Sequence, residues 1–95
     1  MKIDVGFTAQ GISSQMTENK VVVVLDIFRA TSTITTALAQ GAEAIYPVSS
    51  VEKAYLLKNT YPGALLGGEE NSDKISGFDL GNSPQEYTHD LVNGR

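Results

Sequence analysis

The feature that most constrains the fold is an apolar run that ends in a single acid, in residues 21–38 (VVVVLDIFRATSTITTAL). Four valines and a leucine follow one another without polar alternation, which predicts a strand buried on both faces of a parallel sheet. Asp26 then falls at the carboxyl end of this strand, the edge at which open α/β sheets bind ligands. The hydroxyl-rich segment after Arg29 predicts a helix whose N-terminus can hold an anion.

The rest of the chain alternates between strand patterns and helix patterns. The predicted strands are residues 2–7, 21–25, 44–48 and 64–66, and the predicted helices are residues 30–40, 51–59 and 83–92. Two irregular segments, residues 8–19 and 67–82, lie between them. This order predicts an α/β fold with three layers, in which helices cover both faces of a largely parallel sheet.

Helix ends carry the clearest local signals. Gly41 is expected to close the first helix, and Ser49 with Glu52 has the spacing of a capping box for the second. Ser83 and Glu86 repeat that spacing around Pro84, which predicts a firm start for the last helix.

Bulk properties exclude several classes of function. With 95 residues and 19% charged side chains, the chain is expected to form one globular domain. A net charge of −4 offers no basic surface for nucleic acid or an anionic membrane. The absence of cysteine excludes disulfides, thiolate metal sites and a cysteine nucleophile, and together with the lack of an apolar span or signal it predicts a cytoplasmic protein.

Three segments are expected to meet at the ligand-binding edge, namely residues 26–33, 67–70 and 81–83. Asp26 and Glu69 supply carboxylates for one hard cation such as Mg²⁺, and Arg29 has the planar fork that grips phosphate or sulfonate. Further donors for an anion stand at helix starts: Thr31, Ser32, Thr33, Asn82 and Ser83. Asp26 and Arg29 are the predicted catalytic pair, with Asp26 either holding the cation or acting as a nucleophile.

Structural interpretations of the same residues remain open at this point. Asp26 can cap the helix that follows it, and Arg29 can form a salt bridge with Asp26. The threonine hydroxyls can bond back to helix carbonyls rather than face a ligand. Asp79 can brace its own loop, and His89, the only histidine, fits an exposed helix position.

The motifs resemble those of one known family. Residues 23–33 (VVLDIFRATST), residues 36–42 (TALAQGA), Gly68-Glu69 and residues 77–87 (GFDLGNSPQEY) are similar in order and spacing to the N-terminal motifs of 2-phosphosulfolactate phosphatases, the ComB family. The resemblance implies Mg²⁺-dependent hydrolysis of 2-phospho-3-sulfolactate, a small anion, to 3-sulfolactate and phosphate in coenzyme M or sulfolactate biosynthesis.

Family members are more than twice as long as this chain. The resemblance therefore implies that residues 1–95 form a single α/β N-terminal portion of a longer phosphatase, whose unpaired sheet edge can support a homo-oligomer. Two other functions remain open: a non-catalytic anion-binding module, and a phosphatase for another small phosphate ester.

Overall fold

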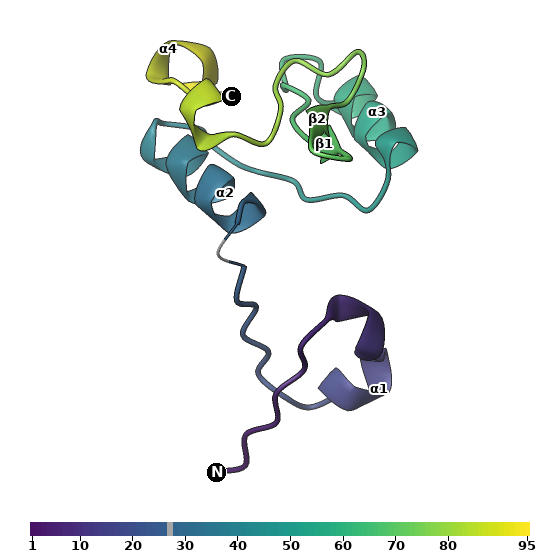
Figure 1. The fold of residues 1–95 in the computed structure, drawn as a ribbon. Helices are drawn as coiled ribbons and strands as arrows, with labels where there is room; N and C mark the ends of the chain where they lie inside the picture. The colour runs from purple at the N-terminus through teal and green to yellow at the C-terminus, as the bar shows by residue number, and fades with distance from the viewer. Residues whose placement is uncertain (27) are drawn as a thin grey trace.

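The computed structural model describes residues 1–26 and 28–95. Figure 1 shows an N-terminal arm (residues 1–26) that extends away from a more compact body (residues 28–95), and the whole measures 44 × 27 × 25 Å. The elements in chain order are η1 (Ala9–Gly11), α1 (Ser14–Thr17), α2 (Ala30–Ala39), α3 (Val51–Thr60), β1 (Glu69–Glu70), β2 (Asp73–Lys74), η2 (Pro84–Glu86) and α4 (His89–Val92).

The predicted three-layer parallel sheet is not formed by the described residues. Their two strands are β1 and β2, which pair antiparallel with Glu69 opposite Lys74 and Glu70 opposite Asp73. This hairpin lies in a segment that the sequence predicted to be irregular. The chain is therefore a small mixed α/β structure with four α-helices in its described part.

The strand predictions for residues 2–7, 21–25 and 44–48 are wrong for this structure, since none of them forms a strand. Val21 and Leu25 are 94% and 88% exposed, although their sequence pattern is that of a buried strand. A central strand needs a hydrogen-bonded neighbour on each side. Among the described residues no backbone hydrogen bond joins residues 21–25 to another segment.

Residues 64–66 also lack strand geometry, but the chain just after them makes a parallel contact. Gly67 forms an isolated parallel bridge with Leu80. The Leu80 N–H donates to the Leu66 carbonyl at 3.0 Å, and the Gly68 N–H donates to the Leu80 carbonyl at 3.1 Å. The bridge holds the segment before β1 against the turn before η2.

The helix α2 confirms the expected helix over residues 30–40. Gly41 has a φ of +100°, the conformation that glycine adopts most readily after a helix. The Gly41 N–H donates to the Leu38 carbonyl and the Ala42 N–H to the Ala37 carbonyl, which is the Schellman pattern.

The capping box predicted for Ser83 and Glu86 is confirmed at the start of η2. One predicted cap and the extent of one predicted helix differ from the structure. The helix α3 begins after Ser50, whose Oγ accepts the Lys53 N–H at 3.3 Å, so the capping box assigned to Ser49 is wrong by one residue. The last predicted helix is divided into η2 and α4, because Tyr87 and Thr88 between them have non-helical backbone angles. The predicted loop over residues 8–19 is also wrong in part, since it contains η1 and α1.

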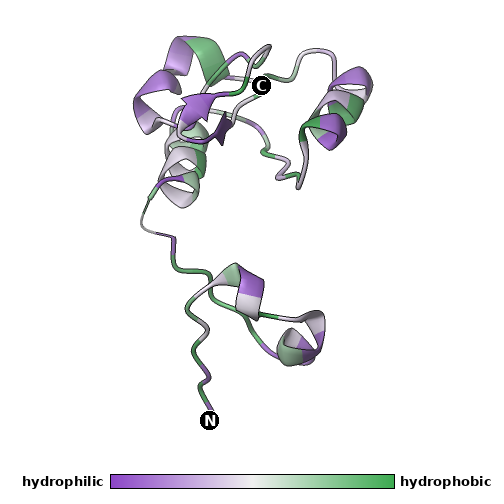
Figure 2. Cartoon of the chain, turned by 45° about the vertical axis from the view of Figure 1, so that its right-hand side comes forward, coloured by the Kyte–Doolittle hydropathy of each residue, from purple (hydrophilic) through white to green (hydrophobic). Residues whose placement is uncertain are grey.

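The hydrophobic core is small and lies in the body. Its central cluster consists of Ala54, Leu66 and Phe78, with Val51 and Ile75 packed against it. Figure 2 shows that apolar residues also run along the extended arm, outside this core. Much of the chain's apolar surface is therefore not buried by its own fold.

Asp79 braces the segment before β1, as the sequence suggested. Its Oδ2 accepts the Leu66 N–H at 2.8 Å and the Lys58 Nζ–H at 3.4 Å, and the Lys58 ammonium also donates to the Ala64 carbonyl at 2.8 Å. The hydrogen bond from Leu66, followed by the contact with Lys58, lowers the pKa of Asp79 below its usual value.

We expect Asp79→Ala to reduce the free energy of unfolding by about 1 kcal/mol, less than the ~1.5–3 kcal/mol of a buried hydrogen bond to a charged group, because the side chain is 41% exposed. A lowered pKa in the folded state means that this contribution is present above the unfolded pKa and is lost as the pH falls through the folded value. Urea titrations at pH 7 and below pH ~4 measure both effects. Asp90→Ala is the control, and an equal loss in both variants would show that Asp79 braces nothing.

Candidate functional site

Arg29 stands at the N-terminus of α2 and pairs with a carboxylate far along the chain. Its NH2 group forms an ion pair with Glu69 Oε2 in β1, 40 positions away. The two side chains are 39% and 26% exposed, so the pair lies partly out of water. Glu69, and not Asp26, is therefore the acid that Arg29 contacts, which corrects the salt bridge that the sequence left open.

Glu69 also contacts the turn before η2. The Asn82 Nδ2 group donates to Glu69 Oε1 at 3.4 Å. The buried hydroxyl of Thr33 donates to the Asn82 carbonyl at 2.7 Å, which ties the same turn to α2. We call Arg29, Thr33, Glu69 and Asn82 the polar cluster. It joins all three segments that the sequence placed at the ligand-binding edge.

Asp26 precedes α2 in the sequence and caps the N-terminal end of this helix. Its Oδ2 accepts the Thr31 N–H at 3.0 Å and the Thr31 hydroxyl at 3.4 Å. This satisfies one of the four N–H groups that lack a partner at a helix start, and it confirms the capping interpretation. Because Thr31 lies two positions from Arg29, Asp26 and the polar cluster share the same end of α2.

Other hydroxyls of α2 serve the helix itself. Thr35 Oγ1 donates to the Thr31 carbonyl at 2.8 Å, and Thr36 Oγ1 donates to the Ser32 carbonyl at 2.9 Å. This confirms for Thr35 and Thr36 that the hydroxyls bond back to helix carbonyls. Ser32 is exposed at the same helix end.

Ser83 is held in the turn by Glu86. The Glu86 carboxylate accepts the Gly81 N–H at 3.0 Å and the Ser83 N–H at 3.2 Å. These two hydrogen bonds, that from Gly81 first, lower the pKa of Glu86. The Tyr87 hydroxyl donates to the Gly81 carbonyl at 2.7 Å, and burial, followed by the charge of Glu86, raises the pKa of Tyr87.

Glu86 and Tyr87 support the turn before η2, but the sequence did not predict them as part of the candidate site. The spacing of Ser83 and Glu86 predicted a cap, and the structure uses that carboxylate to hold Gly81 and Ser83. For Tyr87 no signal existed beyond its place in the GFDLGNSPQEY motif.

A cleft of about 890 Å³ opens beside the polar cluster. Thr33, Glu69 and Asn82 contribute to its lining, and apolar residues of α2, α3 and the chain end line much of the remainder. A substrate at the end of α2 would therefore meet both charged and apolar surface.

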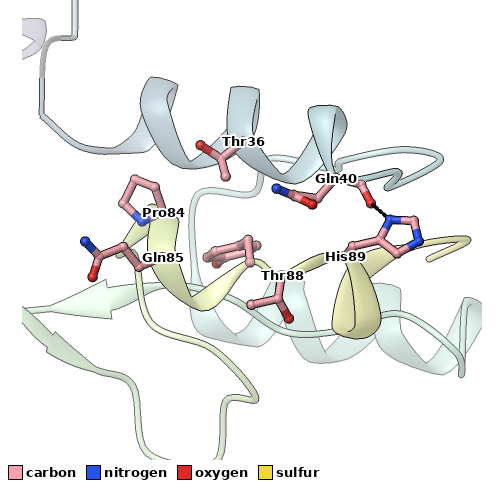
Figure 3. A pocket seen from close by; sticks show the side chains of 7 residues that line it. Thr36, Gln40, Pro84, Gln85, Thr88 and His89 are labelled. Atoms are coloured by element: carbon pink, nitrogen blue, oxygen red, sulfur yellow. Dashed lines mark hydrogen bonds between the residues drawn. The ribbon is translucent and has the colours of Figure 1, made fainter.

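A second, smaller hollow of about 290 Å³ lies between the second half of α2 and the η2–α4 region (Figure 3). Its labelled side chains include no carboxylate or guanidinium, and His89 Nδ1 lies 2.9 Å from the Gln40 carbonyl. His89 is exposed, as the sequence predicted. The charged groups of the polar cluster lie instead at the opposite end of α2.

The described residues include no group of three or more His, Cys, Asp or Glu side chains placed to hold a metal ion. Nor does the described part contain a helix of the length and apolarity needed to cross a membrane.

Comparison with known proteins assigns the family. Residues 7–95 match the family model described as 2-phosphosulpholactate phosphatase, which covers nearly the whole chain. The chain belongs to the 2-phosphosulfolactate phosphatase family. The resemblance of its motifs to this family is thereby confirmed.

Individual relatives in this family show how much of it the chain covers. The chain is 61% identical over 87 residues to a "Probable 2-phosphosulfolactate phosphatase" of Carboxydothermus hydrogenoformans, covering 92% of this chain and 36% of that protein. Proteins with the same name in Clostridium acetobutylicum and Clostridium perfringens (strain SM101) are 48% identical over 96 and 99 residues. All of this chain matches 41% and 40% of them respectively. The chain thus spans about two fifths of the length of these relatives.

Proposed function

We propose that this chain forms the part of a 2-phosphosulfolactate phosphatase that grips the phosphate ester and its cation. The reaction is Mg²⁺-dependent hydrolysis of 2-phospho-3-sulfolactate to 3-sulfolactate and phosphate, in a cytoplasmic setting. The relatives' name supplies the substrate, and they are more than twice as long, so the rest of the active site is expected in the portion that this chain does not match.

The observation that carries the proposal is the ion pair between Arg29 and Glu69. An arginine fork, a carboxylate, an amide and a helix N-terminus meet there from segments 40 and 13 positions apart in sequence. Phosphoryl and sulfonate oxygens are bound by this combination of a planar cation and helix N–H groups. A salt bridge with a purely structural role does not need a helix N-terminus beside it. The presence of the α2 N-terminus at this ion pair therefore favours an anion site.

The protein's oxygen donors fit a cation whose remaining ligands come from water and the substrate phosphate. Mg²⁺ takes oxygen ligands and is usually held by one or two carboxylates, with water and substrate phosphate completing its shell. Asp26 and Glu69 would hold it, since both carboxylates contact residues at the N-terminal end of α2. When bound, the ion would neutralise phosphate charge and polarise the phosphoryl group.

Arg29 has the central role among the chain's own residues. Its guanidinium now contacts Glu69, so a substrate phosphate competes with that carboxylate for the same donors. A cation that takes up Glu69 would free Arg29 for the phosphoryl oxygens, where it stabilises charge that develops in the transition state. Ser32, which is exposed in the first turn of α2, would present its donors to the anion. Thr31 and Thr33 would support this turn through their bonds to Asp26 and Asn82, and Asn82 and Ser83 would border the anion.

Two other functions follow from specific observations. A non-catalytic anion-binding module is consistent with the polar cluster, because an arginine beside a helix N-terminus can bind an anion without hydrolysing it. A phosphatase for another small ester is consistent with the polar cluster, because nothing in it distinguishes sulfonate from carboxylate. Both are outcomes of the following experiment.

The test uses a chimaera in which this chain replaces the matching part of the C. hydrogenoformans relative. We expect phosphate release from 2-phospho-3-sulfolactate that EDTA abolishes and Mg²⁺ restores, with a kcat/KM at least tenfold above that for phospholactate, which lacks the sulfonate. Equal rates for both esters would favour the other-ester phosphatase. Tight binding of the substrate without release would favour the anion-binding module.

A further inference from the structure

The turn before η2 is held by two side chains that follow it in the sequence. The Glu86 carboxylate uses both oxygens on this turn, since Oε1 accepts the Gly81 N–H at 3.0 Å and Oε2 accepts the Ser83 N–H at 3.2 Å. The Tyr87 hydroxyl donates to the Gly81 carbonyl at 2.7 Å. Hydrogen bonds from backbone N–H groups to a carboxylate are among the stronger ones in proteins. The backbone is therefore fixed on both sides of Asn82.

Both supporting side chains lie against glycines. A Cβ built on Gly67 would overlap the Tyr87 hydroxyl, and a Cβ built on Gly81 would lie 2.7 Å from Glu86 Oε2. Neither glycine has the positive φ that by itself favours this residue. The close approach of Tyr87 and Glu86 is therefore what requires glycine at these two positions.

The two glycines lead directly into the polar cluster. Gly67 lies two positions before Glu69, and Gly81 directly precedes Asn82. The Asn82 Nδ2 group donates to Glu69 Oε1 at 3.4 Å, a long hydrogen bond that a small shift of the turn would break. Glu69 in turn pairs with Arg29. The placement of the turn is thus transmitted through one amide and one carboxylate to the guanidinium.

Both supporting groups keep the protonation state that their bonds need. The hydrogen bonds from Gly81 and Ser83 lower the pKa of Glu86, so the group remains a carboxylate that accepts both N–H groups. Burial, followed by the charge of Glu86, raises the pKa of Tyr87, so its hydroxyl remains a donor.

We propose that Glu86 and Tyr87 are positioning residues of the candidate site. They hold residues 81–83 against Gly67, so that Asn82 and Glu69 stay in place beside Arg29. The effect on turnover rests on the proposed function, whereas the effect on the contact between Asn82 and Glu69 does not. Residues that orient a metal-binding side chain typically change metal affinity or activity by roughly 10–100-fold when they are replaced.

The kinetic test uses the chimaera and the close contact between Tyr87 and Gly67. Tyr87→Phe removes the hydroxyl, and Gly67→Ala places a methyl group where the hydroxyl lies. Each is expected to lower kcat/KM and to raise the Mg²⁺ concentration for half-maximal activity by roughly tenfold. In the double variant the methyl group has the space that the hydroxyl left, so kcat/KM should exceed the product of the two single effects by about fivefold or more.

Two controls and the Mg²⁺ requirement separate positioning from stability. Tyr55→Phe removes a hydroxyl outside the candidate site, and Gly11→Ala adds a methyl group whose nearest listed neighbour is Thr8 Oγ1 at 3.6 Å. Both are expected to leave turnover unchanged. A merely structural loss would reduce the amount of folded enzyme and leave the Mg²⁺ requirement unchanged. That result, or single effects that simply multiply, would overturn the proposal.

Nuclear magnetic resonance of the isolated, ¹⁵N-labelled chain tests the positioning without phosphatase activity. Glu69→Gln is expected to shift the side-chain amide signal of Asn82, because the two groups are hydrogen-bonded. With Tyr87→Phe or Glu86→Gln already present, the same replacement should shift that signal less than about half as much. An undiminished response in both backgrounds would overturn the proposal. A chimaera that releases no phosphate would instead contradict the proposed function, and the amide signal would still decide the positioning.

Discussion

Replacing Phe78 by alanine is expected to remove about 3–5 kcal/mol from the free energy of unfolding. Phe78 is 7% exposed and packs with Ala54 and Leu66 in the core cluster. Its ring also meets Tyr55 edge-on, with centroids 5.8 Å apart and planes at 85°. Small domains are stable by only about 5–15 kcal/mol in total, so this loss is a large fraction of the stability and the variant is expected to unfold at a much lower urea concentration.

Urea titration followed by near-ultraviolet circular dichroism measures this loss. Phe7→Ala is the matched control, because it removes the same atoms from a side chain that is 94% exposed, and it is expected to shift stability by less than ~0.5 kcal/mol. Phe78→Leu, which retains most of the apolar volume, should fall between them. Equal losses for Phe78→Ala and Phe7→Ala would mean that the core cluster does not hold the body together.

The helices of the body could be predicted because their signals are local. The Schellman pattern at Gly41 depends on residues within five positions of one another, and glycine favours the required positive φ. The cap of α3 was displaced by one residue because two serines precede that helix, and only the geometry shows which one faces the Lys53 N–H. Boundaries of this kind depend on backbone angles that the sequence does not specify.

The sheet could not be predicted because burial is not local. The valines at positions 21–24 have the pattern of a central strand, yet a strand is buried only where other chain segments flank and cover it. Within the described residues nothing takes those places. The hairpin of β1 and β2 was missed for the opposite reason, since its residues Glu69, Glu70, Asp73 and Lys74 are polar and rank low in strand propensity.

The sequence predicted which segments meet at the candidate site, but it did not predict which side chains pair there. Strand ends and helix starts indicated three segments that would meet, and the structure brings Arg29, Thr33, Glu69 and Asn82 together. The sequence left Asp26 as the partner for Arg29 because the two are close in sequence. The structure instead uses Asp26 for a backbone N–H of α2 and gives Arg29 a carboxylate 40 positions away.

Within the active chimaera, Arg29→Ala is expected to lower kcat/KM by a factor of roughly 10²–10³, the usual cost of removing one preorganised donor to transition-state charge. Arg29→Lys should recover only part of this loss, because an ammonium cannot make two parallel hydrogen bonds to one phosphate. Thr35→Val on the same helix is the control, since the Thr35 hydroxyl bonds only to the Thr31 carbonyl in the described structure. Steady-state phosphate release measures all three variants.

Glu69→Gln separates the two roles proposed for that carboxylate. Glutamine can still accept hydrogen bonds from Arg29 and Asn82, but it carries no charge for a cation. If Glu69 holds Mg²⁺, the Mg²⁺ concentration for half-maximal activity is expected to rise at least tenfold while Arg29→Ala leaves it nearly unchanged. An unchanged Mg²⁺ requirement with a raised KM for substrate would contradict metal binding and leave Glu69 as the residue that positions Arg29. The ion pair would then be a support for the anion site, and Asp26 alone would supply the cation's protein carboxylate.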